Sequence, residues 1–169
     1  MCRFLALALF FASVFVTDIA RAQTCPAGNE RIAPDSRYIN HTNGTVTDNK
    51  TALMWKQCSE GQSGSSCTGT YTTELWQTAL NTANSSTFAN YSDWRLPSAK
   101  ELQSLVETGC HGPSINTTLF PNTPASSFWT VTSYASGASG VWGVNFNVGY
   151  VDVNAKSGSL GVRLVRAAQ

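Results

Sequence analysis

Two stretches of the chain repeat apolar residues at helical spacing. In the later stretch Leu102, Leu105 and Val106 recur at i, i+3 and i+4, which predicts a helix from Ser98 to about Glu107 with one buried face. Ser98 and Glu101 have the spacing of a capping box, in which each side chain bonds the backbone of the other. The earlier predicted helix starts at Thr72 or Thr73 and runs to about Asn84. Its apolar stripe is Leu75, Trp76, Ala79, Leu80 and Ala83.

Short runs of β-branched and aromatic residues, separated by turn residues, predict strands. Residues 44–48 and 53–56 form an expected hairpin, and the last third adds strands at 127–132, 141–146, 150–153 and 162–166. A tight turn is expected at 148–149, with Gly149 at positive φ. Residues 23–43 read as an irregular leader and residues 110–127 as a long ordered loop. The order of elements therefore predicts an α+β domain.

The N-terminus has the features of a secretion signal. Arg3 is followed by an apolar run over 4–16, and Ala20 and Ala22 occupy the small-residue positions of a cleavage site. We therefore expect a signal peptide at 1–22, a single domain at 23–169, and a secreted, periplasmic or cell-surface location. An uncleaved anchor is the alternative. The apolar run is shorter than the ~20 residues that a membrane span needs, and we expect no membrane span after cleavage.

The balance of charge excludes some classes of partner. The chain has 11 Lys+Arg and 10 Asp+Glu, a formal net charge of +1, and no basic run. Nucleic-acid binding needs a positive surface, so we expect no nucleic-acid partner. Arg163 and Arg166 alternate with apolar residues, and at least one of the two is expected to face water.

Four cysteines remain after the signal: Cys25, Cys58, Cys67 and Cys110. An even number in an exported chain indicates disulfides, and four cysteines allow three pairings. The Gly/Ser-rich segment after Cys58 closes easily on Cys67, so we favour this bond together with Cys25–Cys110. A metal site with His111 is the alternative, but the spacings match no zinc finger or ribbon. We expect no metal and no cofactor.

The motif Asp93-Trp94-Arg95-Leu96-Pro97 carries a family resemblance. With the segments 44–48, 53–56, 115–124, 142–151 and 162–166, it resembles the bacterial DUF1566 domain, the C-terminal module of a collagen-like bacterial adhesin. The ending 161–166 is also similar to that of the sulfatase-modifying-factor group, which has a C-type-lectin-like fold. The resemblance implies a compact α+β domain with two helices and a curled antiparallel sheet, and it implies no reaction.

Two features of those groups are missing from the chain. No cysteine follows Cys110, whereas the catalytic cysteines of the sulfatase-modifying-factor group lie near its C-terminus. The Glu-Pro-Asn and Trp-Asn-Asp sugar motifs of calcium-type lectins are also absent from the sequence. A lectin-like fold would therefore not bring lectin chemistry with it.

Two sets of residues are candidates for function. Asp93, Trp94 and Arg95 have a structural interpretation, in which Trp94 packs in the core and Arg95 pairs with a carboxylate, and a less favoured one as an enzyme site. In the late strands Trp142, Val144 and Phe146 are expected in the core. The polar side offers candidate ligand-binding residues Asn145, Asn147, Tyr150, Asp152 and Asn154.

A tyrosine beside several amides suits a neutral sugar, because the ring covers C–H groups while the amides bond hydroxyls. A well-solvated sheet face explains the same pattern equally well. The sequence favours an exported, disulfide-stabilised binding module for an extracellular glycan or surface protein, without enzyme activity. The alternatives are a structural subunit of a surface assembly and an enzyme at 93–95.

Overall fold

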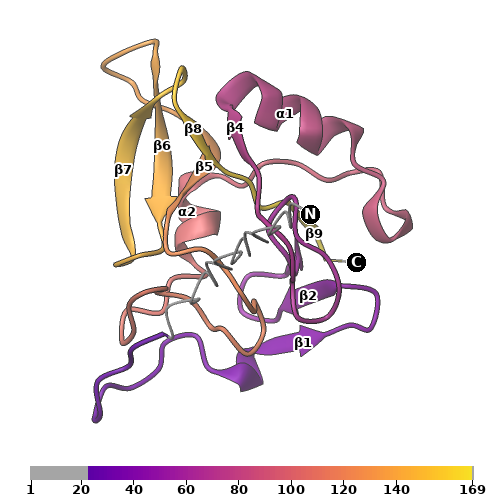
Figure 1. Ribbon diagram of the computed structural model, residues 1–169, viewed down its shortest axis with the longest axis vertical. Helices are drawn as coiled ribbons and strands as arrows, with labels where there is room; N and C mark the ends of the chain where they lie inside the picture. The colour runs from indigo at the N-terminus through magenta and orange to yellow at the C-terminus, as the bar shows by residue number, and fades with distance from the viewer. Residues whose placement is uncertain (1–22, 169) are drawn as a thin grey trace, which may run out of the picture.

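The computed structural model describes residues 23–168. The expected signal peptide lies outside these residues. Figure 1 shows two groups of strands, with one helix at the side of the molecule and a shorter one between them. In chain order the elements are η1 (Asp35–Arg37), β1 (Tyr38–Asn40), β2 (Thr45–Asp48), β3 (Leu53–Lys56), β4 (Thr73–Leu75), α1 (Trp76–Ser85), η2 (Phe88–Asn90), α2 (Ala99–Gln103), β5 (Ser127–Ser133), β6 (Gly140–Asn145), β7 (Tyr150–Ala155), β8 (Ser159–Gly161) and β9 (Val165–Ala167).

The first sheet is antiparallel, with strand order β1-β2-β3-β9. It contains the predicted hairpin, whose turn is held by the buried Asp48. The carboxylate of Asp48 accepts hydrogen bonds from Arg37 Nε (2.7 Å), Lys50 N (3.0 Å) and Thr51 Oγ1 (2.7 Å). Burial raises the pKa of Asp48, but these hydrogen bonds outweigh burial and leave the pKa below its usual value.

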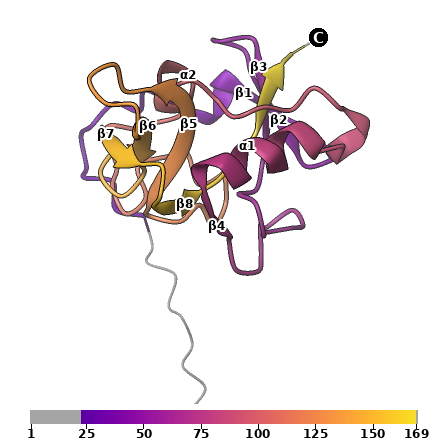
Figure 2. The ribbon, with the colours of Figure 1, turned by 90° about the horizontal axis from the view of Figure 1, so that it is seen from above.

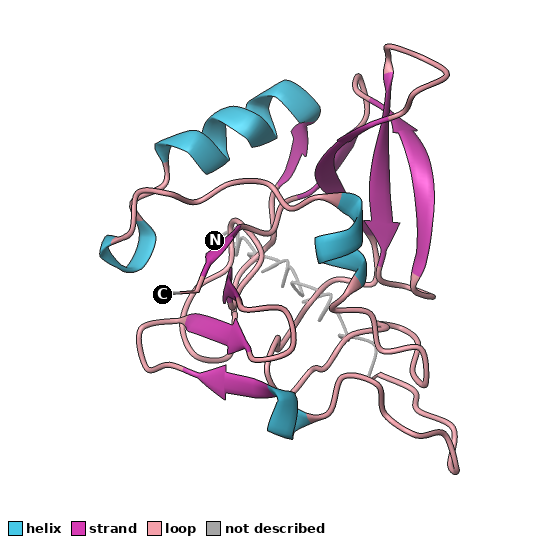
Figure 3. Ribbon diagram, turned by 180° about the vertical axis from the view of Figure 1, so that it is seen from behind, coloured by secondary structure: helices cyan, strands magenta, loops and turns pink. Residues whose placement is uncertain are grey.

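The second sheet has the order β4-β8-β5-β6-β7. It is mixed, because β5 and β8 run parallel where Phe128 lies opposite Gly161, while its other pairs are antiparallel. A Cβ on Gly161 would lie 2.9 Å from the Phe128 ring, so glycine is needed for this close approach. The three longest strands stand together on one side of the molecule, and loops fill the region beside them (Figure 3).

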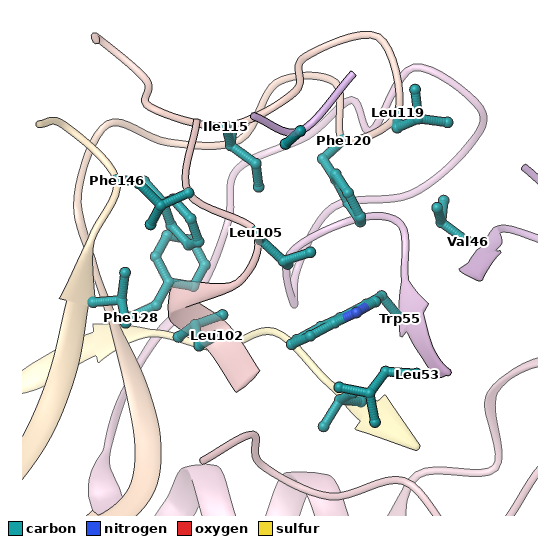
Figure 4. Packing of buried hydrophobic residues seen from close by; sticks show 14 of the residues in the cluster. Val46, Leu53, Trp55, Leu102, Leu105, Ile115, Leu119, Phe120, Phe128 and Phe146 are labelled. Carbon is teal, nitrogen blue, oxygen red and sulfur yellow. The ribbon is translucent and has the colours of Figure 1, made fainter. Parts of the chain in front are cut away.

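The two helices cover opposite faces of this second sheet. Leu102 of α2 belongs to the same buried cluster as Phe128, whereas Ala79 of α1 packs in a second cluster with Trp129. Consecutive strand residues point to opposite faces of a sheet. Phe128 therefore lies in the first cluster, and the next residue of β5, Trp129, lies in the second. Figure 2 shows α1 and α2 on either side of β5. In Figure 4, Leu102 and Leu105 lie between the Phe128–Phe146 pair and Trp55.

The fold class is confirmed as α+β with two helices, and several details differ from the prediction. The strands form two sheets, and one pairing is parallel. Residues 73–75 are a strand rather than the first helical turn, because they pair with β8. The leader contains η1 and β1. Of residues 162–166, only the last two belong to β9.

The capping box of α2 is present as predicted, with Ser98 Oγ accepting from Glu101 N (3.2 Å). The helix is shorter than predicted because Ser104 Oγ donates back to Glu101 O (2.7 Å) and the following turns tighten. Leu105 and Val106 are nevertheless buried, as their spacing indicated.

Candidate functional site

The outer face of β6–β7 is the surface formed by Asn145, Tyr150, Asp152 and Asn154. Asn145 lies opposite Tyr150, Gly143 opposite Asp152, and Val141 opposite Asn154. Opposite residues of an antiparallel pair project from the same face, so the four polar side chains lie on one surface. Tyr150 is 49 % exposed, and Asn145 Nδ2 donates to its hydroxyl at 3.4 Å.

Gly143 gives this surface room at its centre. A Cβ at Gly143 would lie 2.8 Å from Asn154 Nδ2, so the Asn154 amide occupies the space that a side chain would fill. Asp152 is exposed, and its Oδ1 accepts from the backbone N–H of Val153 at 2.7 Å. The outer face therefore offers a carboxylate, two amides and one tyrosine ring.

Asn147, the fifth predicted residue, follows the end of β6, and its backbone N–H donates to Asn145 Oδ1 at 2.8 Å. β6 ends at Asn145, and residues 146–149 form the turn to β7. The carbonyl of Asn147 accepts from Gly112 N (2.8 Å) and Ser114 Oγ (3.3 Å), so this residue fixes the turn to the 112–114 loop. Gly149 has the predicted positive φ of 82°, and a Cβ there would lie 2.6 Å from Val106 Cγ1.

The interior side of the same strands differs from the prediction at one position. Val144 and Phe146 are fully buried, but Trp142 is only half-buried. Its ring packs edge-on against Tyr134, with 5.5 Å between ring centroids. Trp142 lies two residues before Val144, near the start of β6, where the core covers the sheet less completely.

The segment Asp93–Arg95 has the contacts of a structural motif. Trp94 is 2 % exposed, and its Nε1 donates to Phe88 O at 2.9 Å. The Arg95 guanidinium binds both carboxylate oxygens of Glu101, at 2.8 and 2.7 Å. This hydrogen bonding lowers the pKa of Glu101 to about 2. The packing of Trp94 and the carboxylate partner of Arg95 are both as predicted.

Arg163 and Arg166 correct the expectation that one of them faces water, since both are buried. Arg166 donates to Asp93 Oδ1 (2.7 Å) and lies over the Tyr91 ring at 3.9 Å. Arg163 is fully buried, and burial lowers its pKa to about 9. Neither arginine is available to bind an anionic polymer.

Arg163 binds neutral groups around it. Its guanidinium donates to the carbonyls of Lys56 and Gln57, to Ser59 Oγ (3.2 Å) and to Thr123 Oγ1 (2.8 Å). It also lies over the rings of Phe120 (5.1 Å) and Phe128 (5.9 Å). These contacts join the end of β3, the loop between Cys58 and Cys67, and the loop before β5.

Two hollows flank the 58–67 disulfide loop, and Gln62 lines both. The first, the Phe88 groove, has a volume of about 790 Å³ and includes His41, Lys56 and Phe88. Lys56 Nζ lies 4.7 Å from the Phe88 ring centroid and bonds Glu60 at 2.8 Å. The Lys56 ammonium group in this groove is therefore already paired with the Glu60 carboxylate.

The second hollow, the Tyr71 groove, has a volume of about 910 Å³. Its walls are residues 68–71, which follow the disulfide loop, the Gly112–Pro113 turn, and the loop before β5. The lining residues are Gln23, Gln62, Thr68, Gly69, Thr70, Tyr71, Gly112, Pro113, Thr117, Pro121, Asn122, Thr123, Pro124 and Ala125. No side chain in this lining carries a charge.

The two predicted disulfides, Cys25–Cys110 and Cys58–Cys67, are both formed. The first attaches the leader to the segment after α2, beside the buried Glu107. The Glu107 carboxylate accepts from the backbone N–H groups of Ile32 (3.1 Å) and Ala33 (3.0 Å). Disulfide and carboxylate together hold residues 25–33 against the core.

Within residues 23–168, no group of three or more His, Cys, Asp or Glu side chains could hold a metal ion. Over the same range, every helix is too short or too polar to cross a membrane.

The fold and the two disulfides together are those of a disulfide-stabilised α+β module. The sequence model of the Lcl C-terminal domain matches residues 44–166, which is more than half of the chain. The chain belongs to this family. A search of curated proteins gives no match.

Neither groove was predicted from the sequence. The Tyr71 groove joins segments up to about a hundred residues apart, and loops without periodicity carry no signal of their mutual position. The one local sign was the cluster of prolines at 113, 121 and 124, which indicated an ordered loop. The outer face could be predicted because period-two alternation places residues on faces.

Proposed function

We propose that the chain is an exported binding module that recognises glycan or another cell-surface polymer through the outer face of β6–β7. The observation that carries the proposal is the exposed Tyr150 ring beside the amide of Asn145 and the carboxylate of Asp152. The surface belongs to a paired sheet, so these groups have fixed positions before a ligand arrives. Preorganised groups lose less entropy on binding.

The chemistry of the surface favours a polyhydroxylated ligand. A tyrosine ring covers the apolar C–H groups of a sugar, and amide and carboxylate oxygens accept bonds from its hydroxyls. Asp152 repels anionic groups, so the proposed ligand is neutral rather than sulfated or phosphorylated.

Two disulfides support the exported location, because such bonds persist in oxidising compartments. We expect no catalysis at Asp93–Arg95. The side chains of this segment are bound to Glu101, Arg166 and the Phe88 carbonyl, which leaves few groups to act on a substrate.

The experiment is a glycan-array screen of the exported chain, followed by affinity measurements on a hit at low and high salt. Tyr150→Ala and Asn145→Ala should weaken binding without a large change in melting temperature. Val131→Ala is the matched control, because Val131 is similarly exposed on the neighbouring strand β5. Unaltered binding by both variants would remove the outer face as the site.

A second candidate function is that of a structural subunit in a surface assembly. β7 ends the second sheet, and within residues 23–168 its other edge pairs with no strand. Val148 and Tyr150 are exposed beside it. Edges of this kind can pair with another chain. Light scattering over a range of concentrations would show a rise in mass if the chain assembles with itself.

A further inference from the structure

We propose that the Tyr71 groove is a second binding site, which takes an uncharged saccharide unit stacked on the Tyr71 ring. The site shares no residue with the outer face of β6–β7. The inference goes beyond the proposed function, and it stands or fails independently of whether the outer face binds a polymer.

Tyr71 has the position of a stacking platform. One face of its ring packs nearly parallel to Phe128, with 6.4 Å between centroids and 20° between planes. Phe128 is fully buried, whereas Tyr71 is half-buried and lines the groove. The ring is therefore supported from the core side and presents its remaining surface to the groove. Aromatic rings held in this way bind the C–H face of a sugar by dispersion and burial of apolar area.

The backbone around Tyr71 is fixed by the disulfide loop. Thr72 N donates to Glu60 O at 2.8 Å. Gly61 packs so tightly on this segment that a Cβ would lie 2.6 Å from Thr70 O, and its φ is 86°. Glycine at this position lets the loop closed by Cys58 and Cys67 support the platform. A preorganised ring costs less conformational entropy on binding than a mobile one.

The polar groups of the groove suit hydroxyls rather than ions. No lining side chain is charged, so the groove offers no charged side chain to a carboxylate, sulfate or ammonium group. Asn122 uses its Nδ2 to bond Ser66 O (2.8 Å), which leaves Oδ1 as an acceptor. Among residues 23–168, no hydrogen bond occupies the hydroxyls of Thr70 and Tyr71. One acceptor and two hydroxyls beside an aromatic ring match the alternating C–H and O–H groups of a neutral sugar.

A peptide fits these observations less well. Extended peptides bind by adding a strand to an open sheet edge, and the groove is built from loops. Proline-rich peptides bind between several aromatic rings, whereas this lining contains one. The volume of about 910 Å³ is in the range of small-molecule sites and holds more than one sugar unit.

The test is isothermal titration of the exported chain with uncharged hexasaccharides of glucose, mannose and N-acetylglucosamine. The wild-type chain should bind at least one of them. Tyr71→Ala should weaken that binding about tenfold or more, as expected for a central aromatic contact, while Tyr71→Phe keeps the ring and should change it less than about threefold. Val131→Ala is the control, because Val131 is exposed on β5 and lines neither proposed site, and it should leave this affinity unchanged. The Tyr71 variants are also titrated in a Tyr150→Ala background, so that binding at the outer face does not contribute to the measured affinity.

A second variant keeps the test decisive if Tyr71→Ala fails to fold. Asn122→Gly removes the Oδ1 acceptor, together with the Nδ2 bond to Ser66 O, at an exposed position whose φ is 47°, a conformation that glycine adopts easily. It should weaken binding about threefold or more. The proposal is overturned if the wild-type chain binds none of the three saccharides, or if the folded Tyr71 and Asn122 variants bind as the wild type does. Binding of a decaproline peptide in place of any saccharide would also overturn it.

Discussion

The segment Asp93–Arg95 and the outer face of β6–β7 have similar residues, but the first has a buried ring and ion pairs and the second has an exposed ring and an exposed carboxylate without an ion pair among residues 23–168. Each has an aromatic ring, a carboxylate and a further polar side chain. In the first, Trp94 is buried, Asp93 pairs with Arg166, and Arg95 binds Glu101 through two bonds. In the second, the Tyr150 ring and the Asp152 carboxylate are exposed.

This difference separates residues that hold the fold from residues that can bind something else. A polar group bonded to its own chain contributes to stability, and a ligand must break that bond to use it. A group that bonds only water exchanges water for ligand at little cost. The motif that identifies the family is therefore the less suitable binding site, and the plainer sheet surface is the better candidate.

Trp94→Ala should have the largest effect on stability. The side chain is buried between Phe88 and Tyr91, and its removal leaves a cavity and takes away one of the two hydrogen bonds that Phe88 O accepts. We expect the free energy of unfolding to fall by about 3–5 kcal/mol. Urea denaturation followed by circular dichroism measures it.

The matched control is Trp142→Ala, which removes the same side chain from a half-buried position. It should cost clearly less than Trp94→Ala. Equal losses of unfolding free energy would mean that burial does not explain the contribution of Trp94 to stability. They would contradict the contrast drawn here between buried and exposed side chains.

The sequence could predict those features whose signals are local. The Ser98–Glu101 capping box, the 44–56 hairpin and the alternation that gathers Asn145, Tyr150 and Asp152 are all patterns within a few residues. The Cys58–Cys67 bond followed from a short flexible segment in the same way.

The features that the sequence could not predict depend on distant partners. Residues 73–75 read as a helix start, and pairing with β8 makes them a strand. Arg163 and Arg166 alternate like half-exposed strand residues, yet carbonyls, hydroxyls and Asp93 from other segments surround them. The alternation in the sequence places Asn147 on the same strand face as Asn145. In the structure β6 ends at Asn145, and Asn147 lies in the turn that follows.

Removal of the Cys25–Cys110 disulfide should have the next largest effect on stability. It should not change ligand binding at the outer face of β6–β7. The bond closes a loop with a sequence separation of 85, and its loss should cost about 3–4 kcal/mol. Cys25→Ser with Cys110→Ser should therefore lower the melting temperature more than Cys58→Ser with Cys67→Ser, whose bond spans a separation of 9. Thermal melts measure both, and non-reducing peptide mapping of the wild-type chain should recover the two pairings. Mapping that found another pairing would contradict this.

Glu101→Gln should have a smaller effect that depends on pH. Glutamine keeps the capping-box geometry, so the substitution removes mainly the ion pair with Arg95. At pH 7 the exposed partner limits the loss to about 0.5–1 kcal/mol. The folded-state pKa of Glu101 is lowered to about 2 from 4.5, so its contribution is complete above pH 4.5 and disappears as the pH falls toward 2.

Denaturation curves at several pH values test this dependence. The wild-type chain should lose stability faster than Glu101→Gln between pH 4.5 and 2, and the two should converge at the acid end. Glu30→Gln, at an exposed carboxylate of the leader, is the control and should run parallel to the wild type. Parallel curves for Glu101→Gln as well would show that the Arg95 pair contributes nothing.

Tyr150→Ala should have the smallest effect on stability and the largest on binding. The ring is exposed and makes one long hydrogen bond, from Asn145 at 3.4 Å, so the free energy of unfolding should change by less than about 0.5 kcal/mol. If the outer face binds a neutral polymer, the same variant should lose most of its affinity, and raising the salt concentration should alter wild-type affinity only modestly, because no charge pair forms. A large fall in stability would place Tyr150 with Trp94 among the residues that hold the fold. A steep loss of wild-type affinity with salt would instead indicate an anionic ligand at exposed cations such as Lys50 or Lys100, because Arg163 and Arg166 are buried.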